Sequence, residues 1–245
     1  MKAAVNKMTA TIPFRLNASF IQQQGALIAL ILLIIFASIS YENFLTSQNL
    51  LNVLKQNSMI GIVAIGMTFV ILTGGIDLSV GSFIALGGVL SAYLSTMNLT
   101  AAIVIPIVAT AALGLVNGFI IAKGKLEPFI VTLAMMIGVR GLVYIITNEE
   151  SVIASPNTES FFNFLGNGLL LGIPIPVWLF IILIAISWYV LKHTPFGRHT
   201  YAVGGNESAS QLMGVKVAKV KVLVYVISGA LSGLAGIILA GRLGE

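Results

Sequence analysis

One carboxylate stands alone in a long apolar part of this sequence. Within the stretch 57–95, Asp77 is the only charged residue, and it follows the pair Gly74 and Gly75 and precedes Ser79. An acid in this position can accept hydrogen bonds from the free N–H groups of a helix that begins near Ser79. Alternatively, it can contact a polar substrate or an ion. The spacing favours the capping role, and substrate contact stays as the alternative.

A second charged side chain, Arg140, lies within another apolar stretch, 128–147. If this stretch is one helix, Arg140 lies about two turns from its end. Its long side chain can then extend to the membrane surface, or it can face an internal pathway, and both interpretations stay open. The candidates for lining a transport pathway are Thr73, Gly74, Gly75, Asp77, Ser79 and Arg140.

A basic segment, 192–221, contains the second informative pattern. Asn206 suits the start of a helix and Gly214 suits its end, with Glu207 at the positive end of the helix dipole. Between these caps lie three apolar residues at helical spacing, Ala209, Leu212 and Met213. A two-turn helix is not stable alone, so the pattern indicates either a docking element for a partner or an ordinary connecting loop.

The start of the same segment, 193–198, predicts a turn. Pro195 cannot continue the preceding helix, and Gly197 can adopt the positive φ that a tight reversal uses.

No pattern supports catalysis by this chain. Cysteine is absent, which excludes thiolate metal sites and cysteine nucleophiles. The stretch 118–125 resembles a phosphate-binding loop, but its glycines are wrongly spaced and Leu126 stands where Ser or Thr is required. His193 and His199 have no acid or nucleophile placed to form a triad, and no His/Glu pair suggests a metal site. We expect no catalytic residue, metal or cofactor here, so any ATP must be hydrolysed by another polypeptide.

The elements that must position these residues are membrane spans. The chain is 58% hydrophobic and 9% charged, with a mean hydropathy of +1.02, whereas soluble domains are about 25% charged. A bilayer core takes roughly 20 helical residues per span. The sequence therefore predicts an all-α, polytopic membrane helix bundle, with a Gly-Gly break between its second and third spans. Seven spans are expected, at about 25–40, 57–73, 79–95, 101–122, 128–147, 174–191 and 222–241.

The distribution of basic residues predicts the orientation. If the N-terminus is cytoplasmic, ten of the 13 Lys and Arg residues lie inside, including Lys2, Lys7 and Arg15, and only Lys55 and Arg242 lie outside. This is the bias of the positive-inside rule. The net charge of +5 is small, and we interpret it as orientation charge and not as a nucleic-acid-binding surface. The polar stretch 148–172, between the fifth and sixth expected spans, is acidic and lies on the outer side of the membrane in this orientation.

Small residues recur at helical spacing in two of the spans. They are Gly114 and Gly118 in one span, and Gly229, Ser232, Gly233 and Gly236 in the last. In lipid, such residues allow helix backbones to approach closely. We assign them to packing.

Three stretches together resemble the permease subunits of bacterial ABC importers for monosaccharides, and within that family they are most similar to the permeases for ribose. They are 66–82 with its Thr-Gly-Gly-Ile-Asp-Leu-Ser-Val-Gly run, 123–132, and 197–215 with its Gly-Gly-Asn loop. The resemblance covers nearly the whole chain. It implies a multi-pass protein of the bacterial inner membrane, with two permease copies in the complex and a periplasmic sugar-binding protein that delivers substrate.

The resemblance also implies a separate ATP-binding subunit that uses ATP and Mg²⁺ and docks on the basic segment. The expected docking residues are Gly204, Gly205, Asn206, Glu207, Ala209, Leu212, Met213 and Gly214.

The sequence departs from the family at its C-terminal end. Family members continue for several more spans, whereas this chain ends at Glu245, just after a span. We therefore expect residues 1–245 to form a single transmembrane permease domain that is truncated, with the face of Gly229, Gly233 and Gly236 left without a partner helix. The alternatives are an ion-coupled secondary transporter, which also uses broken helices, and a membrane scaffold without transport activity.

Overall fold

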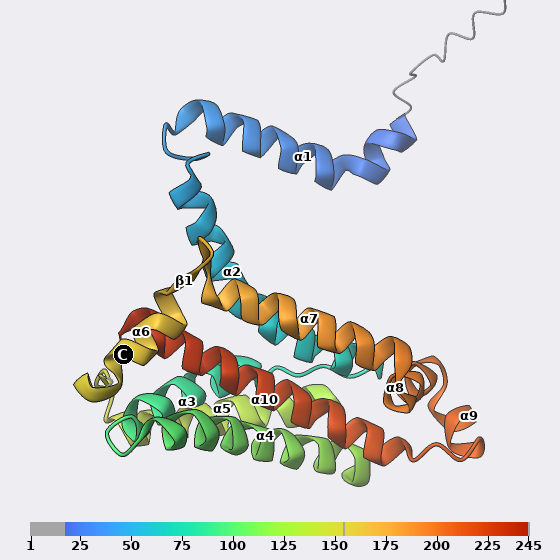
Figure 1. Ribbon diagram of the computed structural model, residues 1–245. Coiled ribbons are helices and arrows are strands. Elements are labelled where there is room, and N and C mark those ends of the chain that lie inside the picture. Colours follow the sequence, from blue (N-terminus) through green and yellow to red (C-terminus); the bar gives the residue numbers. More distant parts are fainter. Residues whose placement is uncertain (1–17, 154, 245) are drawn as a thin grey trace, which may run out of the picture. The chain divides into compact units, whose positions relative to one another are not determined.

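A computed structural model describes residues 18–153 and 155–244, and it is almost entirely helical (Figure 1). The helices are α1 (Ala18–Ser40), α2 (Ser47–Leu72), α3 (Val80–Leu94), α4 (Leu99–Gly124), α5 (Pro128–Thr147), α6 (Pro156–Asn167), α7 (Ile175–His193), α8 (Pro195–Gly205), α9 (Glu207–Leu212) and α10 (Val217–Leu243). Two short strands, β1 (Leu169–Leu170) and β2 (Ile173–Pro174), pair antiparallel. The predictions that concern Lys2, Lys7, Arg15 and Glu245 fall on residues outside those that the structure describes.

Five of the described helices are long and apolar enough to cross a membrane, namely α2, α4, α5, α7 and α10. Two apolar helical segments are shorter, Gln24–Ser40 in α1 and Val80–Leu94, which is α3. The prediction of an all-α membrane helix bundle is therefore confirmed. The chain divides into two compact units, 1–50 and 51–245, of which the first contains α1.

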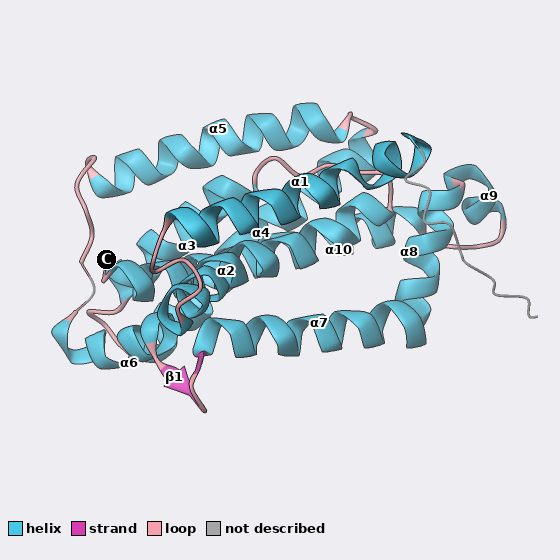
Figure 2. Cartoon of the chain, turned by 90° about the horizontal axis from the view of Figure 1, so that it is seen from above, coloured by secondary structure: helices cyan, strands magenta, loops and turns pink. Residues whose placement is uncertain are grey.

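Helix α10 is the central element of the second unit. It packs along its length against α4 and α3, and α5 packs on the far side of α3. Figure 2 shows α10 between α5 and α7. Helix α2 joins this core through side chains, because Met59, Ile62 and Val63 form one buried cluster with Ala235 and Ile238 of α10. Fourteen residues of α10 are buried, which explains why small residues are frequent on it.

The small residues of α4 and α10 lie where these helices pack closely, which is consistent with the packing role expected of them. The backbone of Gly114 lies against Tyr225, and a Cβ atom added to Gly118 would come within 2.7 Å of the Val222 Cα atom. Gly229 lies against the Thr110 backbone, and Gly236 lies against α3. The expectation that the Gly229 face lacks a partner was wrong, because α4 and α3 cover it. Close backbone approach is what small residues permit in lipid.

This packing predicts opposite effects for two glycine substitutions. Gly118→Ala should lower the melting temperature of the solubilised protein, because overpacking a core costs typically 1–3 kcal/mol. Gly138→Ala is the matched control, since a Cβ atom at that position of α5 meets nothing within 4 Å and alanine favours helix by about 1 kcal/mol over glycine. Equal melting temperatures for the two variants would contradict close packing at Gly118.

Two connections differ from the expectations drawn from the sequence. The stretch 148–172 contains α6 and the small hairpin in addition to loop residues. The predicted turn at 193–198 is limited to Thr194, because α7 ends at His193 and α8 begins at Pro195, with Thr194 Oγ1 accepting a hydrogen bond from the Gly197 N–H at 3.2 Å. Proline is favoured at the first position of a helix, where its missing N–H is not needed. Gly197 has no positive φ. It is buried against the Leu191 backbone, where there is no space for a side chain.

Candidate functional site

The chain leaves the helical conformation between α2 and α3. Gly74 has a φ of +79°, and its N–H donates to the Ile71 carbonyl at 2.9 Å, while the Gly75 N–H donates to the Val70 carbonyl at 3.1 Å. The Thr73 hydroxyl donates to the same Val70 carbonyl at 2.8 Å. These bonds satisfy the backbone where α2 ends, as an irregular segment between membrane helices requires.

Asp77 is fully buried in this irregular segment and accepts hydrogen bonds from Ser79 and from helix α10. Its Oδ1 atom accepts from the Ser79 N–H at 3.1 Å and from the Ser79 hydroxyl. Its Oδ2 atom accepts from the Ser228 hydroxyl of α10 at 2.8 Å. The bond to the Ser79 N–H is a local contact of the Asx-turn type, because Ser79 itself is the N-cap residue of α3 and its side chain makes no capping bond. The bond to α10 adds a tertiary link that no local pattern predicts.

Two further side chains extend these contacts into a network. The Asn117 side chain of α4 donates to the Ser79 hydroxyl at 3.0 Å. The Tyr225 hydroxyl of α10 donates to the Ile76 carbonyl at 3.1 Å. We call this set, Asp77, Ser79, Asn117, Tyr225 and Ser228, the Asp77 network. It ties the irregular segment to both α4 and α10.

Sequence reasoning missed three members of this network, Asn117, Tyr225 and Ser228. A usable signal was present, because Asn117 is the only amide side chain in the predicted span 101–122. A polar side chain inside a membrane span normally has a specific partner. The sequence does not show which hydrogen-bond partner each of these three side chains has in the folded protein.

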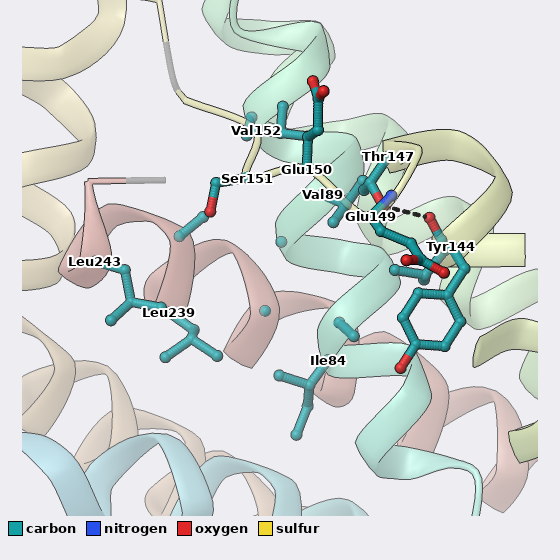
Figure 3. A pocket seen from close by; sticks show the side chains of 16 residues that line it. Ile84, Val89, Tyr144, Thr147, Glu149, Glu150, Ser151, Val152, Leu239 and Leu243 are labelled. Atoms are coloured by element: carbon teal, nitrogen blue, oxygen red, sulfur yellow. Dashed lines mark hydrogen bonds between the residues drawn. The ribbon is translucent and has the colours of Figure 1, made fainter. Parts of the chain in front are cut away.

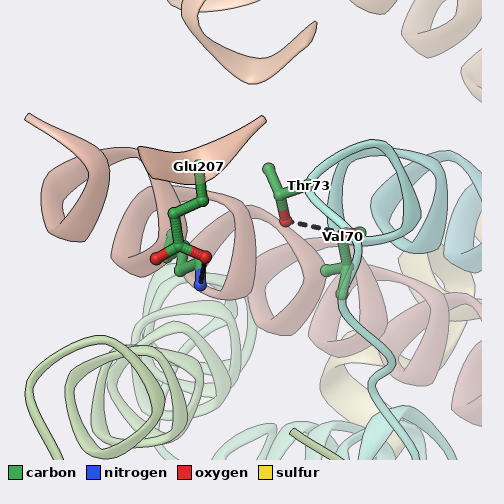
Figure 4. Close-up of polar contacts among 4 residues, drawn as sticks. Val70, Thr73 and Glu207 are labelled. Carbon is green, nitrogen blue, oxygen red and sulfur yellow. Dashed lines mark hydrogen bonds and ion pairs between the residues drawn. The ribbon is translucent and has the colours of Figure 1, made fainter. Parts of the chain in front are cut away.

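A cleft of about 880 Å³ opens at the end of the bundle that carries α8 and α9. Thr73 and Glu207, which come from segments far apart in the sequence, both line it (Figure 4). Other lining residues come from the α4–α5 connection, with Lys125 and Glu127, and from the start of α10, with Lys216 just before the helix and Lys221 in its second turn. The structure therefore brings Thr73 and Gly74 together with the predicted docking segment. We call this space the α9 cleft.

The predicted caps of the docking segment are confirmed. The Asn206 Oδ1 atom accepts from the Ala209 N–H at 2.8 Å, and Gly214 has a φ of +83°. The exposed fraction of Leu212 is 90% and that of Met213 is 71%, whereas Ala209 is partly buried. The apolar surface that α9 offers to a partner is therefore formed by Leu212 and Met213.

The two glycines that precede α9 have different surroundings. Gly204 packs against the last turn of α2, where an added Cβ atom would collide with the Leu72 carbonyl oxygen. Gly205 has open space around its Cα atom. The end of α2 and the approach to α9 are thus in direct backbone contact at Gly204.

Arg140 lies away from these features. It is exposed on α5 and belongs neither to the Asp77 network nor to the lining of the α9 cleft. The structure does not bring it together with the other pathway candidates.

A second cavity, of about 480 Å³, lies at the opposite end of the bundle. Its walls come from α3, α5, α10 and the residues that follow α5, with Tyr144, Glu149 and Glu150 on one side and Leu239 and Leu243 on the other (Figure 3). The cavity combines an aromatic ring and two carboxylates with an apolar wall. Sequence reasoning did not single out these residues.

Comparison with known proteins identifies relatives of the chain. Residues 49–245 match the family described as "Branched-chain amino acid transport system / permease component". The chain is 46% identical over 228 residues to the ribose import permease protein RbsC of Haemophilus influenzae, covering 91% of this chain and 70% of that protein.

Other relatives are similarly close. The Bacillus subtilis RbsC is 45% identical over 224 residues, covering 91% of this chain and 69% of that protein. The L-arabinose transport system permease protein AraH of Escherichia coli is 44% identical over 225 residues, covering 90% and 67%. No solved structure matches the chain. The extent of these matches, taken with the apolar helix bundle, shows that the chain belongs to this family of transport-system permease components.

Proposed function

We propose that this chain is the membrane-spanning permease subunit of an ATP-driven importer for a monosaccharide, and that the sugar is ribose. The observation that carries the proposal is the identity of 44–46% to ribose import permeases over about nine-tenths of the chain. The L-arabinose permease of Escherichia coli is 44% identical, so the assignment to ribose rests on the match to the ribose permeases along the chain and not on a sugar-contacting residue.

We infer that ATP and Mg²⁺ are used by a separate ATP-binding subunit, which docks on α9 and the residues before it. The exposed side chains of Leu212 and Met213 support this role, because interfaces depend on a few buried apolar anchors. The remaining proposed partners are a second permease copy, a periplasmic sugar-binding protein at the opposite end, and the lipid bilayer. Nucleic acid is not among them.

For the membrane arrangement we propose seven spans in one domain, residues 1–245, in the bacterial inner membrane. The five long helices are then joined by α1 and α3, and the irregular segment 73–79 forms the break between spans two and three. The N-terminus is proposed to be cytoplasmic. This orientation places the α9 cleft on the cytoplasmic side and leaves most of the basic residues there, in line with the positive-inside rule.

For the pathway we propose the irregular segment, with Thr73, Gly74, Gly75, Asp77 and Ser79 as the residues that line or shape it. Burial of Asp77 and its three accepted hydrogen bonds support a structural role for its carboxylate. Arg140 stays a candidate because it is exposed on a membrane helix, where a second permease copy or the membrane surface can be its partner.

Ribose uptake by a chimeric permease tests the proposal. This chain would replace the aligned part of the Escherichia coli ribose permease, with which it shares 44% identity over 228 residues, in cells that lack their own ribose permease gene. We expect the chimera to restore uptake of labelled ribose, and we expect ATP depletion to abolish that uptake.

The controls for this experiment are the intact Escherichia coli permease and an empty vector. A chimera that reaches the membrane in normal amounts but supports no uptake would contradict the proposed function. Uptake that is stopped by collapsing the ion gradient while ATP is maintained would instead indicate an ion-coupled transporter.

A further inference from the structure

We propose that Lys221 is a positioning residue that joins α9 to the irregular segment 73–79 through one face of α10. The ion pair with Glu207 forms one end of this link, and Tyr225 and Ser228 form the other. The inference rests on the proposed function for its biological meaning, since α9 is the proposed docking helix. The coupling between α9 and the segment 73–79 is a property of this chain alone, and it can be measured without any partner protein.

The first observation is the way in which α9 is held. The helix has only six residues, too few for stability on its own. Its apolar side chains Leu212 and Met213 point away from the protein and anchor nothing. The Lys221 Nζ atom lies 2.6 Å from the Glu207 Oε2 atom, and this is the only ion pair within residues 18–153 and 155–244. The pair thus links the first turn of α9 to the first turns of α10, in addition to the burial of Ser210 in α9.

The second observation is the spacing of residues on α10. Lys221, Tyr225 and Ser228 stand at positions i, i+4 and i+7 of one continuous helix. With 3.6 residues per turn, this spacing places all three on one face, over about 10 Å of helix length. Tyr225 bonds the Ile76 carbonyl and Ser228 bonds the Asp77 carboxylate. One rigid face of α10 therefore holds α9 at one end and the irregular segment further along.

The third observation is the space between these two attachments. The α9 cleft separates Glu207 from Thr73, and Lys221 lines the same cleft. Figure 4 shows Thr73 bonded to Val70 at the end of α2, with Glu207 placed apart from it. A second connection runs through Gly204 of α8, which packs on the backbone of Leu72 and Thr73. Helix α10 is the connection that carries side-chain hydrogen bonds to Ile76 and Asp77, so we expect a displacement of α9 to reach 73–79 through α10.

Thiol labelling can test this link, because the chain has no natural cysteine. A single Thr73→Cys substitution places a thiol on the wall of the α9 cleft, and Ser208→Cys, at an exposed position of the same cleft, is the matched control. Both are made in the full-length chain in membranes and treated with a water-soluble maleimide. We expect Lys221→Gln to increase the labelling rate at position 73 by roughly two- to fivefold, the size of effect that a partly exposed ion pair supports. The rate at position 208 should stay unchanged.

Two further sets of variants separate a specific link from general loosening. Lys221→Arg, and the exchange Glu207→Lys with Lys221→Glu, keep an ion pair and should return the rate at position 73 to that of the parent. If α10 carries the coupling, Lys221→Gln should have a clearly smaller effect when Tyr225→Phe has already removed the bond to Ile76. A Lys221→Gln variant without effect at position 73, or with the same fold-effect in the Tyr225→Phe background, would overturn the proposal.

The labelling result and the proposed function can fail independently. Labelling needs no ATP-binding subunit, so a failed uptake experiment leaves it interpretable. In the chimera, Lys221→Gln should reduce ribose uptake while the ATP-binding subunit still co-purifies, because Leu212 and Met213 are intact. Loss of co-purification in this variant would show that Lys221 acts on docking itself and would overturn the positioning role.

Discussion

Replacing Leu212 and Met213 together by aspartate should abolish capture of the ATP-binding subunit. Both side chains are more than two-thirds exposed, so nothing in the described structure depends on them and membrane insertion should be normal. Each central apolar anchor of an interface contributes typically 2 kcal/mol or more, and burying a carboxylate in its place adds a desolvation cost. We expect affinity to fall by at least about 100-fold, measured by pull-down of the ATP-binding subunit with the tagged chimera.

The matched control for this experiment is Leu171→Asp. Leu171 is 85% exposed and lies in the hairpin between β1 and β2, at the other end of α7 from α8. Capture of the ATP-binding subunit should be unaffected by this change. Unchanged capture by the Leu212/Met213 double variant would show that α9 is a connecting segment and not a docking helix.

Asp77→Leu should eliminate folded protein or its uptake activity, whereas Asp77→Asn should retain both. The leucine variant removes the acceptor of three buried donors, the Ser79 N–H and the hydroxyls of Ser79 and Ser228, at about 1–3 kcal/mol for each group left unsatisfied. Asparagine keeps an oxygen at Oδ1 for the Ser79 N–H, and its amide can donate to the Ser228 oxygen. The measurement is the melting temperature of the purified protein together with ribose uptake by the chimera.

The outcome separates a structural role from one that needs negative charge. If the asparagine and leucine variants were equally inactive at normal protein levels, the charge itself would be required and capping would be the wrong account. Ser228→Ala offers a further comparison, since it removes only the hydrogen bond between Asp77 and α10 and leaves the bond from Tyr225 to Ile76 in place. We expect its melting temperature to lie between those of the parent and Asp77→Leu.

Features that depend on neighbours along the chain could be predicted from the sequence. Apolar length indicated every long membrane helix, and Asn206 and Gly214 indicated the two ends of α9. These are local properties, because a span needs only enough apolar residues and a cap bonds N–H groups two or three positions away. The small residues of α4 and α10 also predicted close packing, although not which helices would meet.

The connection at Pro195 shows that the position of a proline in the sequence is compatible with two structures. Proline ends one helix and is equally suited to begin the next, so the sequence was compatible with either a turn or a new helix. The buried position of Gly197 against the Leu191 backbone decided for α8. From the sequence alone, Gly197 suggested a backbone conformation that only glycine adopts easily. In the structure, glycine is needed there because the Leu191 backbone leaves no space for a side chain.

The sequence by itself determined that Asp77 is an isolated acid at a helix start and that the segment near Asn206 carries capped, apolar residues. Only the tertiary structure decided that Asp77 bonds Ser228, 151 positions away, and that Thr73 and Glu207 border one cleft. The physical reason is that a buried polar group must find a partner, but any of several distant serines, amides or tyrosines could satisfy it. Helix packing selects among them, and the selection appears in the sequence only as polar residues inside apolar spans.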